Sequence, residues 1–347
     1  MGTMEMVAAA DGREQDDILL HIENLKVGFQ TTSGFVRAVD GVDLKVRRGR
    51  TLAVVGESGC GKSITARSVL GLLPEQNTVM SGSIAFKSRT GEVLDIASLP
   101  RRGKRMRSIR GAEIAMIFQE PMTSLTPVFT VGDQILEALR LHTPVRGAQA
   151  LARAIELLEM VGIPEPESRL KAYPHQMSGG MRQRVMIAMA LASNPSLLLA
   201  DEPTTALDVT VQAQILDLMR GLQDELGMSV VFITHDLGVV AEMAHEVAVI
   251  YLGQVVEYAS VDDLFERPTH PYTRGLLNSL PRIGATERLV PIAGSVPDPR
   301  EHRVGCRFAD RCASRMAKCD TPPPLIKLPH GQDVRCWLHE NEGGTQS

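Results

Sequence analysis

The chain has 347 residues, of which 44% are apolar and 22% are charged, and its formal net charge is −4. This length predicts one large domain or two unequal domains, and the charge balance argues against a general attraction to nucleic acid. The first 16 residues are acidic and lack a basic flank before an apolar core, so we expect a disordered tail and no signal peptide. The apolar runs fall short of the roughly 18 residues that a membrane helix needs. We therefore expect a cytosolic protein with reduced thiols.

Short apolar segments alternate with helical stretches from about residue 18 to residue 265. The clearest strands are predicted at TLAVVG (51–56), IAMIFQ (114–119), SLLLAD (196–201) and SVVFITH (229–235). This alternation is typical of an α/β fold with a parallel sheet and crossover helices. Between residues 127 and 184, two stretches carry apolar residues at three-and-four spacing, which predicts a helical insert within the α/β body.

A phosphate-binding loop is predicted at residues 56–63, which read GESGCGKS and stand between a predicted strand and a predicted helix. Its glycines let backbone N–H groups surround phosphate oxygens, Lys62 adds positive charge, and the Ser63 hydroxyl can ligate Mg²⁺. The following helix directs its positive end toward the same anion. A chance glycine turn is the weaker alternative. The expected nucleotide contacts are Gly56, Ser58, Gly59, Cys60, Gly61, Lys62, Ser63 and Ile64.

Two carboxylates, Asp201 and Glu202, follow the apolar strand SLLLA. Ligands of parallel sheets gather at the carboxyl ends of the strands, where the phosphate loop is also expected. Asp201 can hold Mg²⁺ through water there, and Glu202 can act as general base for an attacking water. A solvated helix cap without chemistry is the alternative. The strand at 229–235 would bring His235 to the same edge of the sheet.

Residues 173–208 read YPHQMSGGMRQRVMIAMALASNPSLLLADEPTTALD and resemble the signature region of ATP-binding cassette (ABC) ATPases. The resemblance covers about residues 19–265. It implies a P-loop NTPase cassette that combines a RecA-like parallel core with an N-terminal antiparallel β part and a helical insert at about 120–185. It also implies ATPase activity, with Lys62, Glu202 and His235 as the catalytic residues.

Further roles follow from the same resemblance. Phe29 would stack on adenine, Gln119 would sense Mg²⁺ and the membrane partner, and Asp208 would couple two nucleotide sites. The implied Mg²⁺ ligands are Ser63, Gln119 and Asp201, and the implied signature loop is Ser178, Gly179 and Gly180. Met181 stands where the family usually has glutamine, but the serine hydroxyl and the glycine N–H groups are retained.

In this family the signature loop completes the nucleotide site of a second subunit, so that two ATP molecules join two cassettes. The resemblance therefore implies three kinds of partner and no nucleic acid. These are a second ABC ATPase subunit, which the importer resemblance implies is a paralogue, two membrane permease subunits and an extracytoplasmic substrate-binding protein. The chain would act as a peripheral protein on the cytoplasmic face of the cell membrane.

The C-terminal part resembles a narrower group of proteins. RPTHPYTRGLLNSLP (267–281) and GCRFADRCASRMAKC (305–319) are similar to the extension of oligopeptide and dipeptide importer ATPases, which nickel importers largely share. We therefore expect a tail at 1–16, a cassette at 17–265 and a small loop-rich extension at 266–347. The implied function is ATP-driven uptake of di- or oligopeptides. A nickel importer and a soluble ABC ATPase without transport are the alternatives.

Four of the five cysteines lie in this extension, at positions 306, 312, 319 and 336. Their spacings are C-x₅-C, C-x₆-C and then sixteen intervening residues, whereas structural zinc prefers C-x₂₋₄-C pairs. Thiolates on loose loops suit the wider span of a 4Fe–4S cluster, and the importer resemblance favours the same cofactor. Zn²⁺ and ordinary free thiols stay open. A small proline-rich unit with little apolar content needs a bound metal or cluster to hold its loops together, so the expected role of the site is structural or redox sensing.

Overall fold

The computed structural model has two compact units, which are formed by alternating segments of the chain. The first unit comprises Met1–Leu20, Lys45–Thr51 and Ala85–Ile233, and the second comprises His21–Leu44, Leu52–Ile84 and Thr234–Ser347. The predicted tail at 1–16 lies outside the described residues. These are residues 17–32, 34–119, 124–205, 207–280, 291–298, 300–301 and 304–342.

The core of the first unit is a set of parallel strands in the order β8-β7-β6, and every residue of β7 and β8 is buried. The pairing places Ile114 beside Leu197, and Leu197 beside Ser229. Such uninterrupted apolar strands are typical of sheets covered on both faces. The strands of this unit are β5 (Val93–Asp95), β6 (Ile114–Ile117), β7 (Leu197–Asp201) and β8 (Ser229–Ile233).

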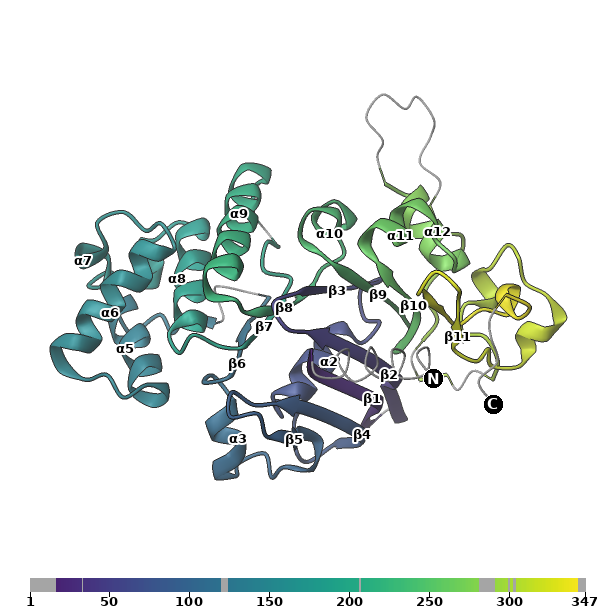
Figure 1. Cartoon of the computed structure of the whole chain (residues 1–347), viewed down its shortest axis with the longest axis horizontal. Helices are drawn as coiled ribbons and strands as arrows, with labels where there is room; N and C mark the ends of the chain where they lie inside the picture. Colours follow the sequence, from purple (N-terminus) through teal and green to yellow (C-terminus); the bar gives the residue numbers. More distant parts are fainter. Residues whose placement is uncertain are drawn as a thin grey trace, which may run out of the picture. The chain divides into compact units, whose positions relative to one another are not determined.

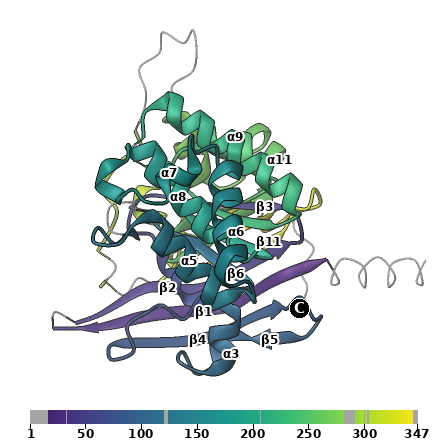
Figure 2. The ribbon, with the colours of Figure 1, turned by 90° about the vertical axis from the view of Figure 1, so that its left-hand side faces the viewer.

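Several helices also belong to the first unit, and α5, α6 and α8 pack on one another (Figure 1, teal), as the view from that side also shows (Figure 2). At the start of α5, the Thr130 hydroxyl accepts from the Asp133 N–H at 3.1 Å, and the Asp133 carboxylate accepts from the Thr130 N–H at 3.2 Å. This reciprocal cap fixes where α5 begins. The helices are α3 (Lys104–Ile109), α5 (Val131–His142), α6 (Gly147–Met160), α7 (Pro166–Arg169), α8 (Gly179–Leu191) and α9 (Val209–Leu226).

The N-terminal strands form an antiparallel sheet in the order β2-β1-β4-β5. Its strands β1 (Ile18–Thr31), β2 (Gly34–Arg47) and β4 (Thr78–Lys87) lie mainly in the second unit. The predicted combination of an antiparallel N-terminal part, parallel core strands and helices is therefore confirmed.

A second run of paired strands, in the order β11-β12-β10-β9-β3, organises the second unit. β3 is parallel to β9, whereas the β9–β10 and β10–β12 pairs are antiparallel. Because β12 pairs through Val334 with Glu257 of β10, the C-terminal extension continues the sheet, which its loop-rich composition did not predict. The bounds are β3 (Thr51–Val55), β9 (Glu246–Tyr251), β10 (Gln254–Ser260), β11 (Ile326–Lys327) and β12 (Asp333–Val334).

Within the described residues, the α-helices of the second unit are α2 (Lys62–Val69), α10 (Leu237–Met243), α11 (Val261–Glu266) and α12 (Pro271–Asn278). The extension is anchored by Tyr272 and Phe308, which join the apolar core around β3, β9 and β10. No helix in the described parts of the chain combines the length and the apolar character that crossing a membrane requires.

Candidate nucleotide site

The predicted phosphate loop connects β3 to α2 and depends on glycine at two positions. Gly56 and Gly61 have φ angles of 149° and 106°, which residues with a side chain rarely adopt. A Cβ atom at Gly56 would lie 2.2 Å from the Ile250 carbonyl oxygen, and one at Gly61 would lie 2.4 Å from the Ala38 carbonyl oxygen. Only glycine therefore fits either position. Ser58 and Gly59 between them are exposed, so this part of the loop is open to a ligand.

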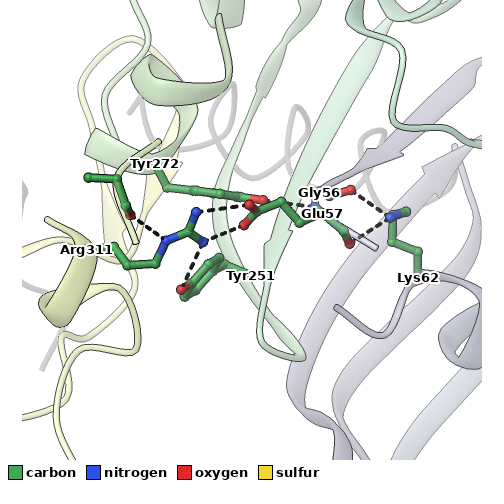
Figure 3. Close-up of polar contacts among 7 residues, drawn as sticks. Gly56, Glu57, Lys62, Tyr251, Tyr272 and Arg311 are labelled. Carbon is green, nitrogen blue, oxygen red and sulfur yellow. Dashed lines mark hydrogen bonds and ion pairs between the residues drawn. The ribbon is translucent and has the colours of Figure 1, made fainter. Parts of the chain in front are cut away.

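Lys62, the first residue of α2, reaches back across the loop (Figure 3). Its ammonium donates to the carbonyl oxygens of Gly56 at 2.7 Å and Glu57 at 3.1 Å, and it lies 3.8 Å from the Cys60 sulfur. Burial raises the pKa of the Cys60 thiol, although the Lys62 charge opposes that shift. Cys60 is therefore a neutral thiol near pH 7, and the backbone of this position is what a phosphate can contact. Ser63 and Ile64 follow in the first turn of α2, where both are half-buried.

Two other predicted site residues lie in the second unit. The Thr234 N–H donates to the carbonyl oxygen of Val54 in β3 at 3.3 Å, and β3 leads into the phosphate loop. His235 is the next residue after Thr234, so the backbone places it beside the end of β3. The His235 side chain is exposed. The next residue, Asp236, caps α10 by accepting from the Gly238 N–H at 2.8 Å. Phe29 is half-buried near the end of β1.

The predicted carboxylates lie at the end of β7 in the first unit. Asp201 is fully buried, whereas Glu202 is half-buried and has a φ of 48°. A left-handed backbone at a residue with a side chain costs on the order of 1 kcal/mol or more and is common at functional sites. The Gln119 amide donates to the Glu202 carboxylate at 3.0 Å, and the Thr205 hydroxyl donates to the same oxygen at 2.9 Å. Two donors therefore fix the direction in which this carboxylate points.

The predicted signature loop begins α8, also in the first unit. The Ser178 hydroxyl accepts from the Met181 N–H at 3.3 Å and so caps the helix, and Ser178 and Gly179 are exposed. A Cβ atom at Gly180 would lie 2.8 Å from Val211 at the start of α9. Asp208 caps α9 by accepting from the Val211 N–H at 3.0 Å. The fold thus brings the signature loop next to the helix that Asp208 starts.

The contacts within each unit join some predicted residues directly. Gln119 donates a hydrogen bond to Glu202, and Lys62 donates to a carbonyl oxygen of its own loop. The predicted Mg²⁺ ligands Ser63, Gln119 and Asp201 belong to different units, and their joint role stays a prediction.

Sequence reasoning missed a group of residues around Glu57, the second residue of the phosphate loop. Its carboxylate pairs with Arg311, and its N–H donates to the hydroxyl of Tyr272 (Figure 3). These partners follow Glu57 by 254 and 215 residues, so no local pattern could have indicated them. The sequence offers one weak signal for Arg311: it directly precedes Cys312, one of the four C-terminal cysteines.

The four C-terminal cysteines are free thiols, of which Cys306 and Cys312 are half-buried and Cys319 and Cys336 are buried. The Cys306 N–H donates to the Cys319 carbonyl oxygen at 2.8 Å. Burial raises the pKa of the Cys306 thiol to about 11, and the charges of the other three thiols add to this shift. Within the described ranges, however, no group of three or more Cys, His, Asp or Glu side chains could hold a metal ion. The described residues therefore give no support to the predicted iron–sulfur and zinc sites.

Comparisons with known proteins place these features in a family. The sequence model described as "ABC transporter" matches residues 39–205, and the one described as "Oligopeptide/dipeptide transporter, C-terminal region" matches residues 256–319. The oligopeptide transport ATP-binding protein AppD of Bacillus subtilis is 52% identical over 332 residues, which are 95% of this chain and 99% of that protein. A probable peptide ABC transporter ATP-binding protein of Sinorhizobium fredii is 53% identical over 325 residues, which are 92% of this chain and 95% of that protein.

Solved structures agree on the fold. The ATP-binding cassette MJ0796, a dimer in a post-hydrolysis state bound to ADP and Pi, has a TM-score of 0.61 and 27% identity. The similarity covers 70% of this chain and 99% of that one. The predicted ABC cassette fold is thus confirmed, and with it the expectation of an ATPase. The chain belongs to the ABC transporter ATP-binding proteins of the oligopeptide/dipeptide importer family.

Proposed function

We propose that this chain hydrolyses ATP to power the uptake of di- and oligopeptides across the cytoplasmic membrane, from its cytoplasmic face. The observation that carries the peptide assignment is the match of residues 256–319 to the C-terminal region of oligopeptide and dipeptide transporters. In this proposal residues 17–265 are the cassette, with its helical part at about 120–185, and residues 266–347 are the importer-type extension.

The nucleotide chemistry that we propose follows from the groups described above and from the family. The loop N–H groups and Lys62 would bind the β- and γ-phosphates, and Phe29 would stack on the adenine. Mg²⁺, held by Ser63, Gln119 and Asp201, would neutralise phosphate charge. Glu202 would accept the proton of the attacking water, and His235 would contact the γ-phosphate. Support for Glu202 comes from its two donors, Gln119 and Thr205, which fix the direction of its carboxylate.

The signature loop supports a two-cassette mechanism. Ser178 and Gly179 are exposed at the N-terminal end of a 13-residue helix, where N–H groups and the helix dipole favour an anion. We propose that Ser178, Gly179 and Gly180 contact the ATP of a second cassette, a paralogue of this chain, and that Asp208 couples the two sites. Closing such a pair needs roughly 5.5 kcal/mol of differential binding, which two charge-assisted phosphate clamps can supply. Two permease subunits and an extracytoplasmic binding protein would complete the importer.

We propose that Cys306, Cys312, Cys319 and Cys336 hold a 4Fe–4S cluster that stabilises the extension. The chemistry of the donor set fits, because four cysteine thiolates are the usual ligands of such a cluster. A single ion needs its ligands closer together than a cluster does. Iron, sulfide and zinc analysis of the purified chain, together with its visible absorption, tests this. Zinc without iron, or thiols without metal, would overturn the cluster.

The function is tested by transport. The chain is co-produced with the neighbouring permeases, a second cassette and a binding protein, and the complex is reconstituted in vesicles. We expect ATP-dependent uptake of a labelled dipeptide or oligopeptide, together with hydrolysis that the loaded binding protein stimulates. Uptake of nickel without peptide would favour the nickel importer. Hydrolysis without co-purifying permeases would favour a soluble ABC ATPase, and either outcome would overturn peptide import.

A further inference from the structure

Glu57 places a carboxylate on the loop that binds polyphosphate. A negative charge in this position opposes the binding of ATP or ADP unless a positive group neutralises it. Lys62 contacts the Glu57 carbonyl oxygen rather than its carboxylate, so its charge stays directed into the loop. The structure supplies the missing positive charge from the C-terminal extension.

Arg311 makes a two-pronged ion pair with Glu57. Its Nη1 lies 2.7 Å from Glu57 Oε2 and its Nη2 lies 3.0 Å from Glu57 Oε1, and the Arg311 side chain is only 5% exposed. The guanidinium is itself fixed, because its Nε donates to the Ala293 carbonyl oxygen at 3.0 Å and it lies over the rings of Tyr251 and Phe308. This planar, buried geometry is the one in which arginine pairs with carboxylate most effectively.

A second contact from the extension holds the backbone of the same residue. The Glu57 N–H donates to the Tyr272 hydroxyl at 2.9 Å, and the Tyr272 ring is fully buried in α12. The rings of Tyr251, Tyr272 and Phe308 pack with centroids 4.7 to 5.4 Å apart, so the hydroxyl has little freedom. Every polar group of Glu57 is therefore engaged: the carboxylate by Arg311, the N–H by Tyr272 and the carbonyl oxygen by Lys62 (Figure 3).

We infer that Arg311 and Tyr272 are positioning residues for the ATP site: they act through Glu57 to neutralise and orient the phosphate loop, so that the extension tunes nucleotide affinity. Neither residue contacts the nucleotide in this scheme. The inference rests on nucleotide binding at the phosphate loop and adds a role for the extension in that binding. Residues that lie more than 200 positions after the loop would then decide how well it binds phosphate.

The test uses the full chain and ADP with Mg²⁺ as the probe, so that no hydrolysis occurs during titration calorimetry. We expect Arg311→Gln to raise the Kd for ADP about tenfold, a change that corresponds to about 1.4 kcal/mol. In the reconstituted transporter, KM for ATP should rise in proportion while kcat changes less than about threefold, because the reacting groups are untouched. Arg315→Gln is the matched control, since Arg315 is a half-exposed arginine of the same extension that pairs with Asp310 and Asp320.

The double variant Glu57→Gln/Arg311→Gln separates neutralisation from folding. Removing both charges should return the Kd for ADP to within about threefold of the wild-type value, because no unpaired carboxylate then faces the phosphates. Failure of this rescue, or an Arg311→Gln variant that binds ADP within about twofold of wild type, would overturn the inference. If Arg311→Gln does not fold, Tyr272→Phe serves as a second test, because it keeps the ring and the Arg311–Glu57 ion pair but removes the hydroxyl that accepts from the Glu57 N–H. We expect this variant to bind ADP about threefold more weakly. Unchanged binding would contradict the positioning role of Tyr272. A wild-type chain that binds no ADP would instead refute the proposed function.

Discussion

The phosphate loop and the turn after β7 both follow a buried five-residue strand, but they hold their shapes by different means. The turn is held by side-chain donors to Glu202: Thr205, three residues later, and Gln119, which lies 83 residues earlier, just after the neighbouring strand β6. The loop relies on glycine backbone inside and on Tyr272 and Arg311, which come from distant sequence, outside. The Glu202 carboxylate is thus oriented by side-chain donors, whereas the phosphate loop keeps an open backbone that side chains outside the loop hold in place.

The largest expected effect would test the role of the turn. Glu202→Gln keeps the shape of the side chain but removes the base, so we expect kcat for ATP hydrolysis to fall about 100-fold or more while ATP binding persists. Phosphate release by the reconstituted transporter and equilibrium ATP binding measure the two effects. Thr205→Ala, which removes one of the donors to Glu202, should lower kcat only about threefold. Unchanged hydrolysis in Glu202→Gln would eliminate Glu202 as the base.

An intermediate effect would test the backbone of the loop. Gly61→Ala combines a positive φ with a Cβ atom 2.4 Å from the Ala38 carbonyl oxygen, so we expect ADP binding to weaken more than about tenfold. Gly59→Ala is the control, because Gly59 has a φ of 79° but nothing within 4 Å of the added Cβ. It should cost only the strain of the left-handed conformation, about 1 kcal/mol. Equal losses in the two variants would show that strain, and not the lack of space, decides the effect.

The smallest expected effect is the pH dependence of stability that comes from His270, which contacts Tyr272. Burial, together with the nearby charges of His339 and Arg274, lowers the pKa of His270 to about 3, and its Nδ1 accepts from the Tyr272 N–H at 3.0 Å. The unfolded chain takes up this proton below about pH 6.5, whereas the folded chain resists it until about pH 3. Stability should therefore fall as the pH drops through this window, by about 1 kcal/mol between pH 7.5 and pH 5.5.

Thermal unfolding of the wild type and of His270→Asn at the two pH values checks this expectation. Asparagine can still cap α12 but does not titrate, so the variant should lose less stability on acidification. Equal losses in both proteins would assign the pH dependence to other groups.

Much of the fold and the local geometry could be predicted from the sequence. Apolar runs at 51–56, 114–119, 196–201 and 229–235 become β3, β6, β7 and β8 with ends shifted by at most two residues. The spacing of GESGCGKS predicts a glycine turn before Lys62, and the structure shows why Gly56 and Gly61 cannot carry a side chain. The hydrophobic period of a strand or helix, the placement of glycines in a turn and the residues that cap a helix all act over a few neighbouring residues. The sequence therefore reveals them.

The sequence by itself therefore determined the strand and helix pattern, the phosphate loop and the family of this protein. Only the tertiary structure decided that Gln119 orients Glu202, that β12 extends the sheet beside β10, and that Arg311 neutralises Glu57. The physical reason is the range of the interactions. A turn or a helix cap is set by bonds between neighbours along the chain. An ion pair between residues 254 positions apart exists only after packing has brought the two side chains to the same place.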